Sequence, residues 1–276
     1  MQTKDKVFVV TGAGNGIGRE VALELLRRGA SVAGVDLRSE SLAETAALAT
    51  AGDRFTQHEL NIADQEAVEL LPMQVAAQHG HVDGLLNVAG IIQKFVLFKD
   101  LDLDEMRKVM DVNFWGTVYL NKAFIPRLTA RPEASLVNVS SMGGFLPVPG
   151  QTVYGASKAA VKLLTEGIYA ELRETSVATT IVFPGAIATN ITGNSGVSSP
   201  GGAKSEEEAK TEAESSKLKP LPADEAAKII VDQAVEKGRF RVTVGKDATM
   251  LDTMARIAPQ RATDLIAKKM ASLIKS

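Results

Sequence analysis

A regular alternation constrains the fold of this sequence more than any other feature: short β-branched runs are separated by longer stretches with helical periodicity. The runs predicted as strands are Val7–Thr11, Ser31–Asp36, Arg54–Leu60, Leu85–Val88, Ser135–Ser140, Thr179–Phe183 and Phe240–Val244. Helices are predicted between them, among others at Ile17–Arg28, Asp64–His79, Leu103–Leu128 and Val153–Glu174. Strands that are apolar along most of their length are typical of a parallel sheet covered by helices. The alternation therefore predicts a doubly wound α/β fold with a parallel sheet of about seven strands, formed by residues 1–276 as a single domain.

Two segments depart from this alternation. Residues 192–220 are rich in Gly, Ser, Lys and Glu and contain few large apolar side chains, which indicates either a functional loop or a tolerated surface insertion. Residues 249–276 have helical periodicity and include Lys268, Lys269 and Lys275. We expect a helical extension there that lies at the surface or at a subunit contact, in preference to membrane attachment.

Composition excludes several classes of function. The chain has no cysteine, so disulfides, thiolate catalysis and Cys-ligated metals are ruled out. A formal net charge of −2 provides no strong field for nucleic acid. The apolar run Val7–Val10 is too short for a signal-peptide core, and no run approaches the roughly 18 residues of a membrane span. We therefore expect a cytoplasmic protein. His58, His79 and His81 lack metal-ligand spacing with carboxylates, so no metal site is expected.

A glycine-rich turn, Thr11 to Gly18, joins the first predicted strand to the first predicted helix. Glycines permit positive φ and a close approach of the backbone to a ligand. The helix N-terminus adds free N–H groups and a positive dipole, which suit a pyrophosphate. No Lys-Ser/Thr pair follows, so a P-loop is not expected, and the position between strand and helix predicts a dinucleotide site.

Asp36 ends the second predicted strand, eighteen positions after Gly18. A carboxylate there accepts hydrogen bonds from an adenosine ribose 2′-hydroxyl and repels a 2′-phosphate. This favours NAD over NADP, although Arg38 is close enough to soften the preference. The alternative is an exposed carboxylate at a strand end.

A second motif, Tyr154-Gly155-Ala156-Ser157-Lys158, follows in the order that a known family has. Together with Thr-Gly-x-x-x-Gly-x-Gly it resembles the short-chain dehydrogenase/reductase family, in its single-domain, Rossmann-type branch. The resemblance covers roughly the first 190 residues and resumes at the last helix and strand. It implies an NAD(H)-dependent oxidoreductase that interconverts a secondary alcohol and a ketone by hydride transfer.

The resemblance also assigns site residues. It implies a catalytic tetrad of Asn113, Ser141, Tyr154 and Lys158. It implies cofactor contacts from Gly12, Asn15, Gly16, Ile17, Gly18, Asp36, Asn61, Ile62, Asn87, Ala89, Gly90, Tyr154, Lys158, Pro184, Gly185, Ile187 and Thr189. Val88 replaces the family's second Asn. Asn61 replaces a common Asp beside adenine but keeps a carbonyl acceptor, so we expect a weakened adenine contact there.

Tyr154 and Lys158 are four residues apart on a predicted helix, so both project from one face. A phenol with a pKa near 10 is a poor base, and moving its pKa to about 7 takes roughly 4 kcal/mol. We expect the Lys158 ammonium, helped by an oxidised nicotinamide, to lower it. Ser141 would polarise the substrate oxygen; its neighbour Ser140 faces the other way, and the family spacing selects Ser141. In the family, Asn113 anchors a water that relays protons.

Alternatives remain open. One is a sensor or scaffold that binds dinucleotide without turnover, and another is a carbonyl reductase that prefers NADPH. The substrate is expected to be an apolar small molecule, because apolar residues flank the motif loops: Ile91, Ile92, Phe95, Phe98, Phe145, Leu146 and Val148. The resemblance further implies a homo-oligomer, dimer or tetramer, and a lid at residues 192–220 that closes over the substrate.

Overall fold

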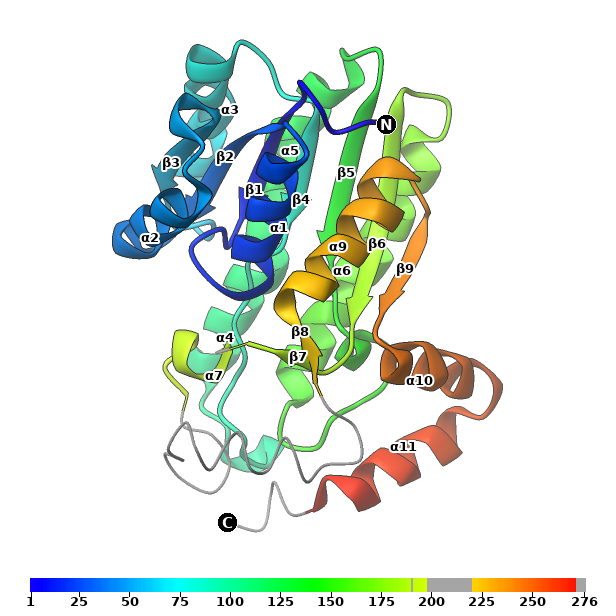
Figure 1. The fold of residues 1–276 in the computed structure, drawn as a ribbon. Coiled ribbons are helices and arrows are strands. Elements are labelled where there is room, and N and C mark those ends of the chain that lie inside the picture. The colour runs from blue at the N-terminus through cyan, green and yellow to red at the C-terminus, as the bar shows by residue number, and fades with distance from the viewer. Residues whose placement is uncertain (190, 198–219, 272–276) are drawn as a thin grey trace.

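The computed structural model describes residues 1–189, 191–197 and 220–271. A seven-stranded sheet forms its centre, in the order β3-β2-β1-β4-β5-β6-β9, and every neighbouring pair is parallel (Figure 1). The strands are β1 (Val7–Thr11), β2 (Ser31–Asp36), β3 (Phe55–Glu59), β4 (Gly84–Asn87), β5 (Ala134–Val139), β6 (Val177–Pro184) and β9 (Arg241–Val244). The predicted fold class is confirmed.

Helices cover both faces of the sheet (Figure 1). One face packs against α1 (Gly16–Arg27), α2 (Ser39–Ala49) and α9 (Ala223–Ile230). The other packs against α3 (Gln65–His79), α5 (Gly116–Thr129) and α6 (Thr152–Leu172). In β1, Phe8 and Val10 join the first cluster, whereas Val7 and Val9 join the second, so the strand is buried on both sides.

The helix predicted at Leu103–Leu128 has three parts. It comprises α4 (Leu103–Met110), a π-helical turn at Asp111–Trp115 and then α5. The prediction of one continuous helix was therefore wrong, because a wide turn interrupts the α-helical hydrogen bonding. Such turns occur frequently at functional sites, and this one contains Asn113.

The carboxyl ends of all seven strands meet at one edge of the sheet, the lower edge in Figure 1. From β1 the chain adds strands first toward β3 and then, from β4, on the opposite side. Doubly wound sheets bind ligands at this switch point, between β1 and β4. A small parallel pair, β7 (Ile187–Ala188) with β8 (Leu221–Pro222), and the short helix α7 (Ile191–Asn194) lie beyond this edge.

The C-terminal extension forms two helices, α10 (Lys246–Ile257) and α11 (Pro259–Lys269), because Pro259 begins a second helix after Ala258. Of the departing segment 192–220, positions 198–219 lie outside the described residues, so its role as a lid stays a prediction. Within the described part of the chain, no helix is long and apolar enough to cross a membrane.

Candidate active site

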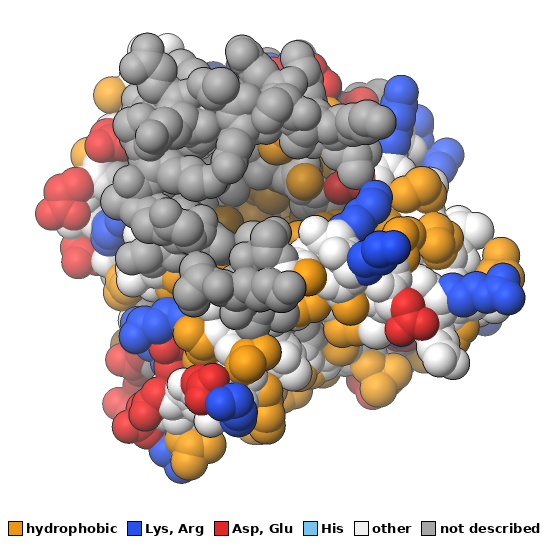
Figure 2. Space-filling model, turned by 90° about the horizontal axis from the view of Figure 1, so that it is seen from below, with side chains coloured by type: hydrophobic (Ala, Val, Ile, Leu, Met, Phe, Trp, Pro, Cys, Tyr) orange, Lys and Arg blue, Asp and Glu red, His pale blue; other side chains and the backbone are white. Residues whose placement is uncertain are grey.

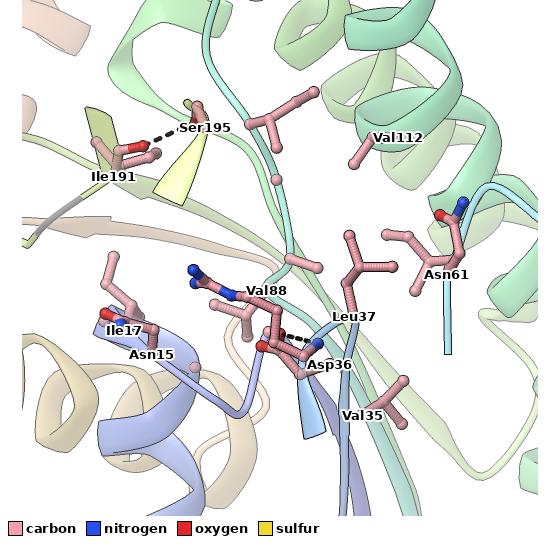
Figure 3. Close-up of a pocket in the computed structure, with 18 of the residues that line it drawn as sticks. Asn15, Ile17, Val35, Asp36, Leu37, Asn61, Val88, Val112, Ile191 and Ser195 are labelled. Atoms are coloured by element: carbon pink, nitrogen blue, oxygen red, sulfur yellow. Dashed lines mark hydrogen bonds between the residues drawn. The ribbon is translucent and has the colours of Figure 1, made fainter. Parts of the chain in front are cut away.

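A cavity of about 270 Å³ lies at the carboxyl edge of the sheet, between the β1–α1 turn and the loop after β4. Asn15 and Ile17 border it from the turn, Asp36 from β2, and Ile191 and Ser195 from the segment around α7 (Figure 3). The predicted cofactor residues that line it are Gly12, Asn15, Gly16, Ile17, Gly18, Asp36, Asn61, Ile62, Ala89, Gly90 and Thr189. Eleven of the 21 residues that line the cavity are thus residues that the sequence assigns to the cofactor, and their contact with it stays a prediction.

The glycine turn has the form that a pyrophosphate requires. Gly12 and Gly16 have positive φ values of 70° and 53°, and a Cβ at Gly18 would overlap the carbonyl oxygen of Gly12. Asn15 precedes α1 without a side-chain capping bond, and the first turn of α1 has no acidic residue. The N-terminal amides and their positive dipole therefore face the cavity uncompensated, so these residues fit a dinucleotide phosphate.

The Asp36 carboxylate also has a structural role that the sequence did not predict. Its Oδ2 accepts a hydrogen bond from Gly14 N at 2.9 Å, and its Oδ1 accepts one from Arg38 N at 3.1 Å. These bonds fix the glycine turn against β2. A carboxylate offers about four acceptor positions, so Asp36 retains capacity for a ribose hydroxyl.

Ser140 and Ser141 use their hydroxyls differently. Ser140 Oγ is buried and donates to the main-chain oxygen of Lys158 at 2.7 Å. Ser141 Oγ accepts from Gly143 N at 3.1 Å and hydrogen-bonds the Tyr154 phenol. Only the hydroxyl of Ser141 therefore meets Tyr154, whereas that of Ser140 holds α6 against the end of β5.

Tyr154 and Lys158 lie one turn apart on α6, with the Lys158 Nζ 6.0 Å from the centre of the Tyr154 ring. The ammonium donates to the main-chain oxygen of Val139 at 3.1 Å. Burial raises the pKa of Tyr154 above its ordinary value, and the hydrogen bond with Ser141 opposes this rise. Burial also lowers the pKa of Lys158 to about 8. Burial thus opposes the lowering expected from Lys158 and an oxidised nicotinamide, and that lowering stays a prediction.

Asn113 is fully buried in the π-helical turn. Its Oδ1 accepts from Ile91 N at 2.9 Å, and its Nδ2 donates to the main-chain oxygen of Ile91 and to Ser157 Oγ, both at 2.9 Å. The side chain thus joins the loop after β4 to α6. A role in proton relay stays a prediction.

The remaining predicted residues lie beside the cavity. Asn87 turns its amide into the core, where Nδ2 donates to Asn121 Oδ1 and Asn138 Oδ1 at 2.9 and 2.8 Å. Pro184 ends β6, Gly185 N donates to the main-chain oxygen of Val244 at 2.9 Å, and Ile187 begins β7. The loop from Pro184 to Thr189 therefore approaches the cavity only at Thr189.

Three residues that sequence reasoning missed hold these loops together. Asp247 Oδ2, at the start of α10, accepts from Ala186 N at 2.8 Å. Ser195 Oγ accepts from Ile92 N at 3.0 Å and donates to the main-chain oxygen of Ile191. Gln93 is fully buried and bonds to the start of α6. No local pattern marks them, since each acts on a segment distant in sequence.

An apolar cluster adjoins Ser141 on the other side. Met142, Phe145 and Leu146, which follow Ser141, pack against α10 and α11 through residues such as Leu251 and Ile266. Hydrophobic side chains are also exposed on this lower face of the molecule (Figure 2). The described residues contain no cluster of His, Cys, Asp or Glu that could hold a metal ion.

Comparison with known proteins places this site in a family. Residues 6–198 match the family model described as short chain dehydrogenase. The chain belongs to the short-chain dehydrogenase family. It is therefore an oxidoreductase of that family with a Rossmann-like nucleotide-binding fold.

Individual members of the short-chain dehydrogenase family match over nearly the whole chain. A protein of Mycobacterium tuberculosis named as an oxidoreductase, SadH, is 37% identical over 271 residues, which cover 96% of this chain and 95% of that protein. A family member from Burkholderia phymatum, solved in complex with NAD, superposes with a TM-score of 0.81 at 24% identity and 95% and 96% coverage. One from Burkholderia cenocepacia J2315, in complex with NADP, gives 0.77 at 26% identity and 96% and 99% coverage.

Proposed function

We propose that this chain is an NAD(H)-dependent oxidoreductase that interconverts a secondary alcohol and a ketone, with Tyr154 as the acid/base. The observation that carries the proposal is the half-buried Tyr154 side chain, hydrogen-bonded to Ser141 and one helical turn from Lys158, at the sheet edge that bears the glycine-turn cavity. The membership of the short-chain dehydrogenase family supports it.

The chain's own residues would bind, orient and move a proton. When bound, the dinucleotide supplies or accepts the hydride. Tyr154 gives its phenolic proton to the ketone oxygen during reduction and takes it back during oxidation. Ser141 donates a hydrogen bond to the same oxygen as its charge changes. Lys158 keeps a positive charge next to the phenolate that remains after proton transfer, and Asn113 holds the adjoining loop.

The preference for NAD rests on Asp36. Its carboxylate lines the cavity at the end of β2, where a 2′-phosphate would meet negative charge. Related structures contain either NAD or NADP, so they do not decide between the two cofactors. Arg38 and Lys108 also line the cavity and favour the alternative, an NADPH-preferring reductase.

The substrate we propose is an apolar small molecule. Its support is the apolar cluster directly after Ser141, which includes Met142, Phe145 and Leu146. Methionine side chains adapt their shape to bound apolar groups, so the partly exposed Met142 and Phe145 favour hydrocarbon over a charged or sugar-like substrate.

The test is turnover by the purified protein, followed through the absorbance of NADH and NADPH with a panel of linear and cyclic apolar ketones. We expect reduction with a higher kcat/KM for NADH than for NADPH. Tyr154→Phe should lower kcat by about a hundredfold to ten-thousandfold while NADH still binds. A Tyr154→Phe variant with normal kcat would refute the assigned chemistry. Tight NADH binding without turnover on any ketone would instead favour the sensor or scaffold.

A further inference from the structure

Gln93 lies in the loop after β4, sixty residues before the helix that carries Tyr154, and its side chain is fully buried. Its Oε1 accepts hydrogen bonds from Val153 N and from Tyr154 N, both at 2.9 Å. Its Nε2 donates to the main-chain oxygen of Gly150 at 3.0 Å. The Gln93 side chain thus hydrogen-bonds to three residues around the start of α6: Gly150, Val153 and Tyr154.

The first amides of a helix need acceptors from outside the helix. The usual source is the side chain of the preceding residue, but Gln151 at that position makes no capping bond. Gln151 instead points back and donates through Nε2 to the main-chain oxygen of Gln93 at 2.7 Å. The start of α6 is therefore capped by the loop after β4.

The same loop forms a wall of the dinucleotide cavity. Val88, Ala89, Gly90 and Ile91 line that cavity, and Gln93 follows two residues later. Any shift of this loop relative to α6 would therefore change the position of the Tyr154 phenol relative to the cavity.

We propose that Gln93 is a positioning residue for Tyr154: its amide fixes the backbone of Tyr154 against the loop that walls the cofactor cavity. This inference rests on the function proposed above. Gln93 itself acts through the main chain and does not reach the phenol through any described contact. The geometry it secures matters because displacement of a reacting group by about 1 Å can lower a rate roughly a hundredfold.

The test compares three variants of the full chain. Gln93→Met keeps the size and removes both hydrogen-bonding ends. Gln93→Glu keeps the oxygens that accept from Val153 and Tyr154, at a helix end that favours negative charge. Gln151→Met is the matched control: Gln151 is also buried and bonds the same loop, but it does not contact the amide of Tyr154.

Two readouts are needed. Hydrogen exchange of the Val153 and Tyr154 amides, followed by NMR, shows whether their hydrogen bonds to Gln93 are formed. This measurement does not depend on enzyme turnover. Steady-state kinetics with the best ketone reports the chemistry. For Gln93→Met we expect faster exchange at both amides and a kcat lower by about tenfold or more, with the KM for NADH within about threefold. Gln93→Glu should restore most of kcat, with the falling limb of its pH profile for ketone reduction moved to higher pH, because the new carboxylate raises the pKa of the nearby phenol. Gln151→Met should retain kcat within about threefold.

The outcomes separate the two proposals. If the wild-type protein turns over no ketone, the proposed function fails, whatever the amides show. If the wild type is active and Gln93→Met exchanges faster yet keeps its kcat, the cap exists but does not position Tyr154, and the inference is wrong. Unchanged exchange, or an equal loss of kcat in Gln151→Met, would also overturn it. If Gln93→Met does not fold, the kcat and the pH limb of Gln93→Glu decide.

Discussion

Individual residues at this site are held in environments that cost stability. Lys158 is buried, and burial lowers its pKa from 10.5 to about 8. A protein that needs a cation beside Tyr154 must keep an ammonium where water is scarce. Active sites commonly trade stability for function in this way, and the trade can be measured at Lys158.

We predict that Lys158→Met is more stable than the wild type at pH 7 although it is inactive. Since the folded pKa lies below the unfolded one, the unfolded chain binds more protons between pH 8 and 10.5, and the cost of burying the charge is complete below pH 8. Removing the charge outweighs the loss of one hydrogen bond to Val139, which is worth about 1 kcal/mol. Thermal unfolding as a function of pH should show the excess stability of the variant shrinking as pH rises from 8 to 10.5. A variant less stable than the wild type at pH 7 would contradict this.

Residue identities were predictable from sequence where a motif fixes the spacing, but their bonding was not. The motif distinguishes Tyr154 and Lys158, and the spacing selects Ser141, which alone of the two serines contacts the Tyr154 phenol. Burial depends on the whole fold, so its opposing effect on the Tyr154 pKa could not be predicted from the sequence. Gln93 was not predicted as a site residue because the residues to which it hydrogen-bonds are about sixty positions away in the sequence.

Among the elements, those defined by local pattern were predicted best. Helix α3 begins at Gln65 and ends at His79, close to the predicted Asp64–His79, because Asp64 caps it and Gly80 follows it. The break between α4 and α5 was not predicted. Its π-helical turn contains Asn113, whose side-chain amide donates to Ile91 and Ser157 in other segments. The periodicity of the sequence does not predict such long-range contacts.

The C-terminal helix α10 is tied to the loop after β6 by one side chain. Asp247 accepts from Ala186 N, within the loop that the family resemblance assigns to the nicotinamide. We predict that Asp247→Ala weakens NADH binding by about twofold to tenfold, since the loss of a hydrogen bond worth about 0.5–1.5 kcal/mol frees the loop. Asp247→Asn retains an acceptor and should bind NADH nearly as the wild type does. NADH titration by fluorescence measures both.

Asp252 provides the control for this prediction, because it lies on the same helix and pairs with Arg241 and Arg256 without touching the loop. Asp252→Ala should lower the unfolding temperature and leave NADH affinity unchanged. Equal NADH affinity in Asp247→Ala and the wild type would remove Asp247 from the support of the cofactor site.

On the scale of the whole molecule, the sequence predicted the sheet and its coverage. All seven predicted runs, including Arg54–Leu60 and Phe240–Val244, correspond to strands of one parallel sheet. Their ends differ by up to a few residues, because hydrogen bonding at strand ends depends on the neighbour. The division of the C-terminal extension into α10 and α11 follows from Pro259, yet its packing beside Ser141 depends on tertiary contacts through Leu251 and Met254.

The described surface carries large apolar side chains on adjacent helices. Leu103 on α4 is 62% exposed, Trp115 in the π-helical turn 45% and Leu163 on α6 69%. Helix α6 packs beside α4 and this turn, so the three lie on neighbouring elements of one face of the sheet. Large apolar side chains exposed on neighbouring elements indicate a surface that contacts another protein chain.

We predict that the protein is a homo-oligomer, a dimer or a tetramer, that associates through this surface. Light scattering at micromolar concentration should give at least twice the chain mass of 29.3 kDa. Leu163→Glu should reduce the oligomer, because a closed symmetric interface contains each substitution more than once and charges desolvated there repel. Met73→Glu is the control: Met73 is 60% exposed on α3, so its change leaves the proposed surface intact and should not alter the mass. A wild-type monomer, or equal dissociation by both substitutions, would show that this apolar surface serves some other purpose than self-association.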